Sequence, residues 1–361
     1  MKKLLRFALS TVCALSLVAC TDDDPPTPPL PPDPPVTITG AYVVSEGNYF
    51  SHINGSLTAY NPETKTAKAD VFATVNGRAL SGTPNDATVH GTKLYITNTD
   101  ENIVEVADAK TARSIAQISL SGARCVRGYD GYIYVTSFTD GTVSKIDTVN
   151  YEVAATLSVD ANPEDMAIVG GKLYVPNSGY GAGNTVSVID LASFTKEQTL
   201  TVPTNPTKVF AYVDKLFLIC SGKYTADYSG YEEDPALYAL SPDGTTRKIG
   251  NATMAAAGFG YIYYINNNFY SATGITYSRY DIANSRSEVW DIERKPFAPY
   301  AIGTSPSDGH IYVSSYDAID YGTGDLYPNY NDRCYVIRYG KCGLVADEFM
   351  AGVNAGTFIF F

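Results

Sequence analysis

A three-residue pattern that recurs seven times constrains the fold of this chain more than any other feature. Each copy has an aliphatic residue (Ala in the first), an aromatic residue and then usually a β-branched residue. The copies are Ala41-Tyr42-Val43, Leu94-Tyr95-Ile96, Ile133-Tyr134-Val135, Leu173-Tyr174-Val175, Leu216-Phe217-Leu218, Ile262-Tyr263-Tyr264 and Ile311-Tyr312-Val313. Their aromatic residues are 39 to 53 residues apart, and a Gly or Asp stands shortly before the last six copies. The pattern predicts a β-strand that leaves a tight turn.

Further strand-like segments surround each copy of the motif. A second strand follows it, such as residues 143–147, and a third leads onward, such as residues 153–159. A short apolar strand, such as residues 166–169, then precedes the next motif. Four strands within 40 to 50 residues, repeated around an axis, are typical of a propeller. The sequence therefore predicts an all-β fold, a seven-bladed β-propeller of four-stranded antiparallel blades.

The two ends of the repeat region complement each other. The first copy begins directly at its motif, with no strand before it, whereas residues 354–360 follow the last blade as an extra strand-like segment. We expect this C-terminal strand to complete the first blade, because closure of the ring removes exposed strand edges. Residues 40–361 are therefore predicted to form one domain of about 46 residues per blade.

The first 39 residues are predicted to be an export signal and a tether. A basic start with Lys2, Lys3 and Arg6 precedes a short apolar run, which is typical of a secretory signal peptide over residues 1–19. The sequence Leu17-Val18-Ala19-Cys20 resembles a bacterial lipobox, which implies lipidation at Cys20. A plain secreted protein with a chance cysteine is the alternative.

Residues 20–39 follow the predicted cleavage site. Their acidic run, Asp22-Asp23-Asp24, resembles a surface-export signal of Bacteroidetes lipoproteins, although a solvated charge run is the alternative. Eight of the chain's 20 prolines lie within residues 25–35, which predicts an extended polyproline II tether. We expect a protein anchored by its lipid on the cell surface at the outer membrane, with no other membrane contact.

The charge and the residue composition exclude several kinds of function. Lys and Arg number 26 against 38 Asp and Glu, so the acidic surface argues against nucleic acid as a partner. Three histidines make a polyhistidine metal site nearly impossible, and no nucleophile elbow or phosphate-binding loop is present. We therefore expect no enzyme, no catalytic residues and no required cofactor. The 29 tyrosines are the remaining anomaly.

Four long loops are predicted on one face of the ring: residues 45–54, 221–235, 266–275 and 314–333. Long loops on one rim of a rigid scaffold commonly carry function. Tyrosine suits a binding surface, because it offers a broad apolar face, a hydroxyl and few rotamers. The ligand-binding residues predicted on this face are Tyr49, Phe50, His52, Asn85, Arg124, Phe138, Tyr180, Tyr228, Tyr231, Phe269, Tyr270, Tyr300, Tyr316, Tyr327 and Tyr330.

Other side chains of the domain have two predicted roles. Near the axis, the polar candidates from the blade connections are Arg78, Asn85, Arg124, Glu164, Asn205 and Tyr300. The motif tyrosines, such as Tyr95, Tyr134 and Tyr174, are predicted to be core instead. A bound Ca²⁺ is possible where Asp317, Asp320, Asp325 and Asp332 crowd the last loop. No disulfide is expected among Cys125, Cys220, Cys334 and Cys342.

The repeat, with its Val-x-x-Ile-Asp strand and its Pro, resembles the YncE-like seven-bladed propellers. The opening Tyr42-Val43-Val44-Ser45-Glu46-Gly47-Asn48 and residues 351–358 resemble a Bacteroidetes lipoprotein branch of that group. That branch includes the BtuG-type lipoproteins, which capture cobalamin and other corrinoids and cap a TonB-dependent outer-membrane transporter. The resemblance implies a corrinoid ligand and such a transporter as partner. The alternatives are a module that binds a protein or glycan, and a lactonase- or lyase-like propeller enzyme.

Overall fold

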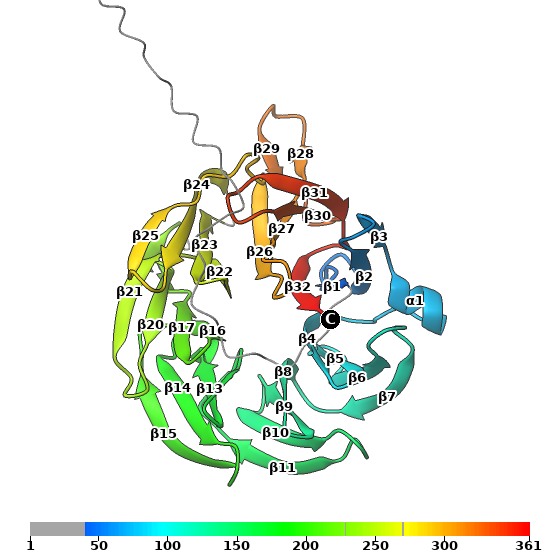
Figure 1. The fold of residues 1–361 in the computed structure, drawn as a ribbon, viewed down its shortest axis with the longest axis vertical. Helices are drawn as coiled ribbons and strands as arrows, with labels where there is room; N and C mark the ends of the chain where they lie inside the picture. The colour runs from blue at the N-terminus through cyan, green and yellow to red at the C-terminus, as the bar shows by residue number, and fades with distance from the viewer. Residues whose placement is uncertain (1–39, 228, 269–270) are drawn as a thin grey trace, which may run out of the picture.

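Seven antiparallel sheets stand around a central axis like the blades of a propeller (Figure 1). The structure, a computed structural model, describes residues 40–227, 229–268 and 271–361. Each sheet has four strands, and successive blades follow one another around the ring. The fold predicted from the repeat is confirmed.

In each blade, one strand lies nearest the axis and three more follow it outward. From the innermost strand outward, blade 1 contains β32 (Ala355–Phe360), β1 (Ala41–Ser45), β2 (Ser56–Asn61) and β3 (Thr66–Lys68). Blade 2 contains β4 (Pro84–His90), β5 (Lys93–Asn98), β6 (Ile103–Asp108) and β7 (Ser114–Ser119). Blade 3 contains β8 (Ala123–Tyr129), β9 (Tyr132–Ser137), β10 (Thr142–Asp147) and β11 (Val153–Ser158). Blade 4 contains β12 (Ala167–Val169), β13 (Lys172–Asn177), β14 (Thr185–Asp190) and β15 (Thr195–Thr201).

Blades 5 to 7 complete the ring in the same order. Blade 5 contains β16 (Pro206–Tyr212), β17 (Lys215–Cys220), β20 (Ala236–Leu240) and β21 (Thr246–Asn251). Blade 6 contains β22 (Met254–Gly258), β23 (Tyr261–Asn268), β24 (Ser271–Asp281) and β25 (Arg286–Val289). Blade 7 contains β26 (Ala298–Thr304), β27 (Ile311–Tyr316), β30 (Tyr335–Tyr339) and β31 (Val345–Met350).

Blade 1 is built from both ends of the domain, as predicted. Strand β32 pairs antiparallel with β1 and supplies the innermost strand. Gly40 and Phe361 exchange two backbone hydrogen bonds at the end of this pairing, and Phe361 stacks on Tyr42 with ring centroids 4.5 Å apart. The closure leaves no sheet edge exposed at the junction between the first and last blades.

The motif strands form the core of the blades. Tyr95, Tyr134 and Tyr174 are at most 3% exposed, which confirms the predicted core role. Burying an aromatic or aliphatic side chain of this size contributes about 1.5–3 kcal/mol relative to leaving it exposed. The single tryptophan, Trp290, is also buried and lies edge-on between two tyrosine rings of blades 6 and 7.

The strand order gives the ring two different faces. One face carries the blade-to-blade connections and the loops after the motif strands, and we call it the long-loop face. The other face carries tight turns such as the one before each motif strand, and we call it the short-turn face. Two of the long loops contain hairpins of their own, β18 (Lys223–Tyr224) with β19 (Tyr231–Glu233) and β28 (Ala318–Asp320) with β29 (Leu326–Pro328).

One predicted loop is wrong. Residues 266–275 mostly continue the hairpin of blade 6, since β23 reaches Asn268 and β24 starts at Ser271. The asparagines and small residues of this stretch do not break the strands. They extend the ladder beyond the rest of the blade, so the hairpin projects from the long-loop face.

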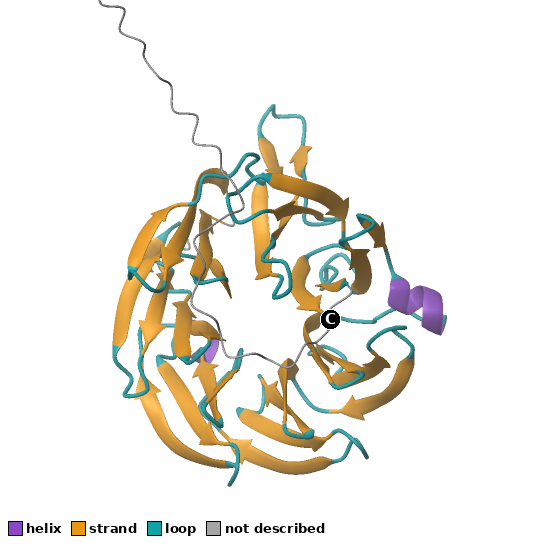
Figure 2. Cartoon of the chain, in the orientation of Figure 1, coloured by secondary structure: helices purple, strands orange, loops and turns teal. Residues whose placement is uncertain are grey.

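Helix is rare in this ring (Figure 2). The α-helix α1 (Val71–Asn76) connects blades 1 and 2 at the periphery and buries Phe72. The one 3₁₀ turn among the described residues, η1 (Gly179–Gly181), lies in the loop after β13. Within residues 40–361 as described, no helix is long and apolar enough to cross a membrane.

The prediction that no domain cysteine forms a disulfide is wrong for Cys342, which is disulfide-bonded. Cys125, Cys220 and Cys334 are free and buried, so none of the four domain cysteines is bonded to another. Burial raises the pKa of the Cys125 thiol well above its usual value. These three cysteines are therefore unreactive parts of the core.

Candidate ligand-binding site

β-bulges at the start of the innermost strands shape the mouth of the central channel. The pairing register shifts between Pro84 and Asp86, between Ala123 and Val126, between Pro206 and Lys208, and between Pro299 and Ala301. A similar shift in blade 1 leaves Gly356 out of the ladder. Bulges redirect side chains and are frequent beside functional sites. Here they occur in five blades at one height along the axis.

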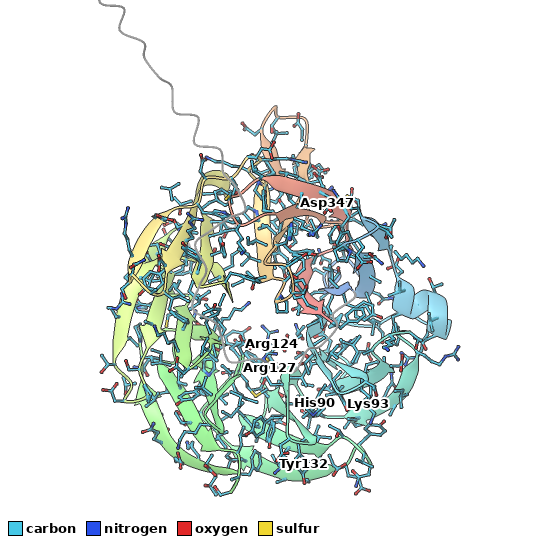
Figure 3. All side chains as sticks on the ribbon, in the orientation of Figure 1. His90, Lys93, Arg124, Arg127, Tyr132 and Asp347 are labelled. Carbon is cyan, nitrogen blue, oxygen red and sulfur yellow. The ribbon has the colours of Figure 1, made fainter. Side chains whose placement is uncertain are left out.

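The bulged segments line a cavity of about 390 Å³ on the axis. Asn85, Arg124, Glu164 and Thr207 belong to this lining, together with Gly356. Blade 4 lines the cavity with residues outside its ladder, since residues 164–166 lie between the isolated Pro163–Asn177 bridge and the start of β12. Figure 3 shows Arg124 and Arg127 beside the central opening, at the inner end of blade 3.

A half-buried ion cluster connects the inner strands of blades 2, 3 and 4. One guanidinium nitrogen of Arg127 lies 2.5 Å from Asp86 and another lies 2.5 Å from Asp165. The Cys125 sulfur lies 2.9 Å from Asp86 and 3.1 Å from Asp165, so its one S–H can donate to either carboxylate. The backbone N–H groups of Val126 and Met166 donate to Asp86 and Asp165 respectively. Because Arg127 joins one oxygen of each carboxylate, this cluster acts as the structural base of the cavity.

Arg124 forms a second ion pair nearer the mouth. Its Nε donates to Glu164 at 3.0 Å, and Ser178 donates to the other oxygen of that carboxylate. Burial disfavours the Arg124 cation, but Glu164 and Glu46 outweigh it and raise the pKa of Arg124. The guanidinium also lies over the ring of Phe138, 5.5 Å from its centroid. The arginine is thus held from two blades and remains charged.

Glu46 faces the cavity from blade 1, just beyond the end of β1. The Tyr300 hydroxyl of blade 7 donates to Glu46 Oε1 at 3.0 Å. Burial raises the pKa of Glu46, while Arg124 and the Tyr300 hydrogen bond oppose that rise. Burial and the neighbouring Glu46 likewise raise the pKa of Tyr300. Tyr300 therefore stays a neutral hydrogen-bond donor.

Two aromatic groups connect the loops to these charged residues. On blades 3 and 4, Tyr180 lies 6.1 Å from Phe138, the ring beneath Arg124. On blade 7, Tyr330 packs against Tyr316, which packs against Tyr300. Blades 3 and 7 lie on opposite sides of the axis (Figure 1). The mouth is thus flanked by an aromatic group on each side.

The predicted ligand residues differ widely in exposure. Tyr180 is 84% exposed and Phe50 is 91% exposed, so both present their rings to solvent. Tyr316 is buried, which corrects its predicted place on the open rim, because Tyr300 and Tyr330 pack against its ring. Its ring reaches the site only through Tyr300.

The remaining predicted aromatics of the described residues form separate pairs that do not line the axial cavity. Tyr49 and Phe50 pack edge to face on the blade 1 loop, which also carries the exposed His52. Tyr231 stacks on Tyr224 in the β18–β19 hairpin, and Tyr327 lies 6.0 Å from Tyr321 on the β28–β29 hairpin. Tyr228, Phe269 and Tyr270 lie outside the described residues.

Two polar candidates are not at the axis. Arg78 binds Glu105 and Ser114 on the outer strands of blade 2 and lies over Phe72 of α1. The prediction for Arg78 was wrong because α1 turns the connection between blades 1 and 2 outward. Asn205 stays in its connection, where its side chain donates to the backbone of Gly222. Asn85, Arg124, Glu164 and Tyr300 are at the mouth as predicted.

The aspartates of the last loop do not converge. The carboxylate of Asp320 accepts the N–H groups of residues 322–324, and Asp317 and Asp332 each accept the N–H of the next residue. Among the described residues, no group of three or more His, Cys, Asp or Glu side chains is placed to hold a metal ion. The possible Ca²⁺ in this loop stays a prediction, without a cluster of carboxylates among the described residues to support it.

Sequence reasoning missed five charged residues of the cavity: Glu46, Asp86, Arg127, Asp165 and Lys208. A signal was present, because Asp86, Asp165 and Lys208 each stand two residues after a proline at or before the start of an innermost strand. These residues were missed because a bulge is a backbone irregularity, and no residue type in the sequence marks where it occurs.

Comparisons with known proteins agree on the fold. Residues 39–215 match the model of a family described as a domain of unknown function, DUF5074. No curated protein matches the chain.

Solved propellers resemble the chain at low identity. A candidate 6-phosphogluconolactonase from Bacteroides uniformis is 13% identical, with a TM-score of 0.63 over 89% of this chain and 99% of that one. Its counterpart from Bacteroides fragilis is 12% identical, with a TM-score of 0.62 over 91% and 100%. Hydrazine synthase from Kuenenia stuttgartiensis is 16% identical, with a TM-score of 0.56 over 84% and 97%. At these identities the likeness concerns the propeller fold.

Proposed function

We propose that this protein is a lipid-anchored, non-enzymatic binding protein of the outer-membrane surface. It captures cobalamin or a related corrinoid on its long-loop face and passes it to a TonB-dependent transporter. The observation that carries the proposal is the mouth of the channel, where aromatic groups on blades 3 and 7 flank a polar cavity. A large planar ligand with amide groups on its rim needs apolar surface and polar partners side by side.

The shape of the site favours a ligand that lies across the mouth. The axial cavity of about 390 Å³ is at the small end of ligand pockets, so a corrinoid ring does not fit inside it. Exposed Tyr180 on one side and the half-buried Tyr300 on the other offer ring contacts at the rim. The ring would rest there while a smaller part of the ligand enters the cavity.

The position of the tether supports capture from the outside. Gly40 pairs with Phe361 at the short-turn face, so the proposed lipid at Cys20 would connect to that face. Twenty residues of polyproline II tether would span up to about 60 Å. The long-loop face would then point away from the anchor, toward ligands outside the cell.

Calorimetric titration tests the proposal. Cyanocobalamin is titrated into the mature chain carrying Cys20→Ser, which removes the lipid, and we expect one-site binding. Phe138→Ala and Tyr180→Ala should each weaken binding about tenfold, as loss of an aromatic contact does. Val149→Ala, an exposed residue on the short-turn face, should have no effect. No heat and no spectral change with the unmutated chain would refute corrinoid binding.

A second candidate is a module that binds a protein or a glycan. The observation in its favour is the spread of exposed aromatics, since Tyr49, Phe50 and Tyr321 belong to loops of blades 1 and 7 and do not line the axial cavity. Such a distributed rim suits an extended partner better than a small ligand. A pull-down from outer membranes that recovers a partner without corrinoid would favour this second function.

A further inference from the structure

Several hydrogen-bond donors of the axial cavity have no acceptor in the described part of the chain. Arg124 uses Nε for Glu164, but its two terminal nitrogens donate to no described residue. Lys208, which lines the same cavity, has no described carboxylate within 4.0 Å. Asn85 accepts from Thr99 through its oxygen, and its amide nitrogen is left for a ligand.

Some hydrogen-bond acceptors of the same cavity also receive no donor from the described residues. Glu46 receives the Tyr300 hydroxyl on Oε1, and its second oxygen has no donor among the described residues. The same holds for Oδ1 of Asp86 and for Oδ2 of Asp165, whose other oxygens bind Arg127. Donors and acceptors therefore face one small space.

The charges in this space nearly balance. Arg124 is paired with Glu164, which leaves Lys208 and Glu46 as the cation and the carboxyl group without an ion-pair partner among the described residues. A ligand anion would meet Glu46, and a ligand cation would meet Lys208 and Arg124. A neutral group with both an acceptor and a donor satisfies both sides and buries no net charge.

From this balance we propose that the axial cavity is a subsite for a carboxamide group of the ligand. The amide oxygen accepts from Arg124 and Lys208, and the amide N–H groups donate to Glu46. The inference rests on the proposed function and adds the chemical group that enters the channel. Phe138 lies under the Arg124 guanidinium and beside Tyr180, and these two rings contact the apolar part of the ligand outside the cavity.

Small probes test the subsite directly. Propionamide, propionate and propylamine are titrated separately into the ¹⁵N-labelled Cys20→Ser chain, and binding is followed by chemical-shift changes. We expect propionamide to bind about tenfold more tightly than either charged probe, because a site built for hydrogen bonds rejects a group that cannot make them. Equal or tighter binding of propionate or of propylamine would overturn the proposal.

A variant pair assigns the effect to the cavity. Lys208→Met keeps the length of the side chain and removes the donor, so propionamide affinity should fall about threefold to tenfold. Lys248→Met removes an exposed lysine of the outer strand β21 and should change nothing. An unchanged affinity in Lys208→Met would contradict the proposed role.

The two proposals fail in distinguishable ways. Amide selectivity without cyanocobalamin binding would refute the corrinoid as ligand and keep the carboxamide subsite. Cyanocobalamin binding without amide selectivity would keep the proposed function and overturn the subsite.

Discussion

Glu46 shows how a single residue couples the core to the ligand site. It follows the last residue of β1, lies beside Arg124 and accepts the Tyr300 hydroxyl. A carboxyl group whose pKa is raised in the folded state weakens folding at a pH above that pKa, because the unfolded chain ionises more easily. The penalty disappears once the pH falls below the pKa of the unfolded chain.

Replacing Glu46 with glutamine should therefore stabilise the protein in a pH-dependent way. Glu46→Gln keeps an acceptor for Tyr300 and removes the buried charge, so we expect a gain of about 1 kcal/mol at pH 8 that vanishes near pH 4. Urea unfolding at several pH values measures it. The exposed Glu63→Gln serves as control. A variant less stable than the unmutated chain at pH 8 would contradict this account of Glu46.

At the scale of the element, the turns before the motif strands vary in their residues. Blade 3 uses Asp130 and Gly131 at positive φ, as tight two-residue hairpin turns prefer. Blade 5 instead places Val213 at φ 58°, although a β-branched residue is strained there. Val213 is 54% exposed, so the packing of its side chain offsets little of the backbone strain.

A glycine at this position should stabilise the protein. Val213→Gly relieves the left-handed strain, and we expect a gain of about 1 kcal/mol in the free energy of unfolding. Val149 is the matched control, since it is exposed on the same face without a positive φ, and Val149→Gly should be neutral or destabilising. Loss of stability in Val213→Gly, measured by urea unfolding, would show that the valine makes a contact that outweighs its strain.

Elements of this fold were predictable where the sequence repeats. The motif tyrosines, the strand order and the closing strand β32 follow from periodicity and from the need to bury one face of each strand. The site was only partly predictable. Arg124 and Tyr300 were predicted at the mouth, but Glu46 and Lys208 were missed because bulges, rather than composition, direct the chain toward the axis. Tyr316 is buried because Tyr300 and Tyr330 pack against it, and no local pattern reveals these contacts.

At the scale of the whole molecule, one strand closes the ring. Deleting residues 355–361 removes β32, uncovers the edge of β1 and leaves the core between blades 1 and 7 open. We expect the truncated chain to lose cooperative unfolding and to aggregate, because an open strand edge recruits other chains. Calorimetry and light scattering measure both effects. A truncated chain that melts like the full domain would contradict the closure as a source of stability.

The central claim is that a corrinoid binds on the long-loop face, and hydrogen exchange in the presence of saturating cyanocobalamin tests it most directly. We expect slower exchange in the loop of residues 178–184 and at the bulges near Arg124 and Tyr300. No change is expected at the short-turn face, for example around Val149 and Val213. Protection confined to the short-turn face, or no protection at either face, would contradict the claim.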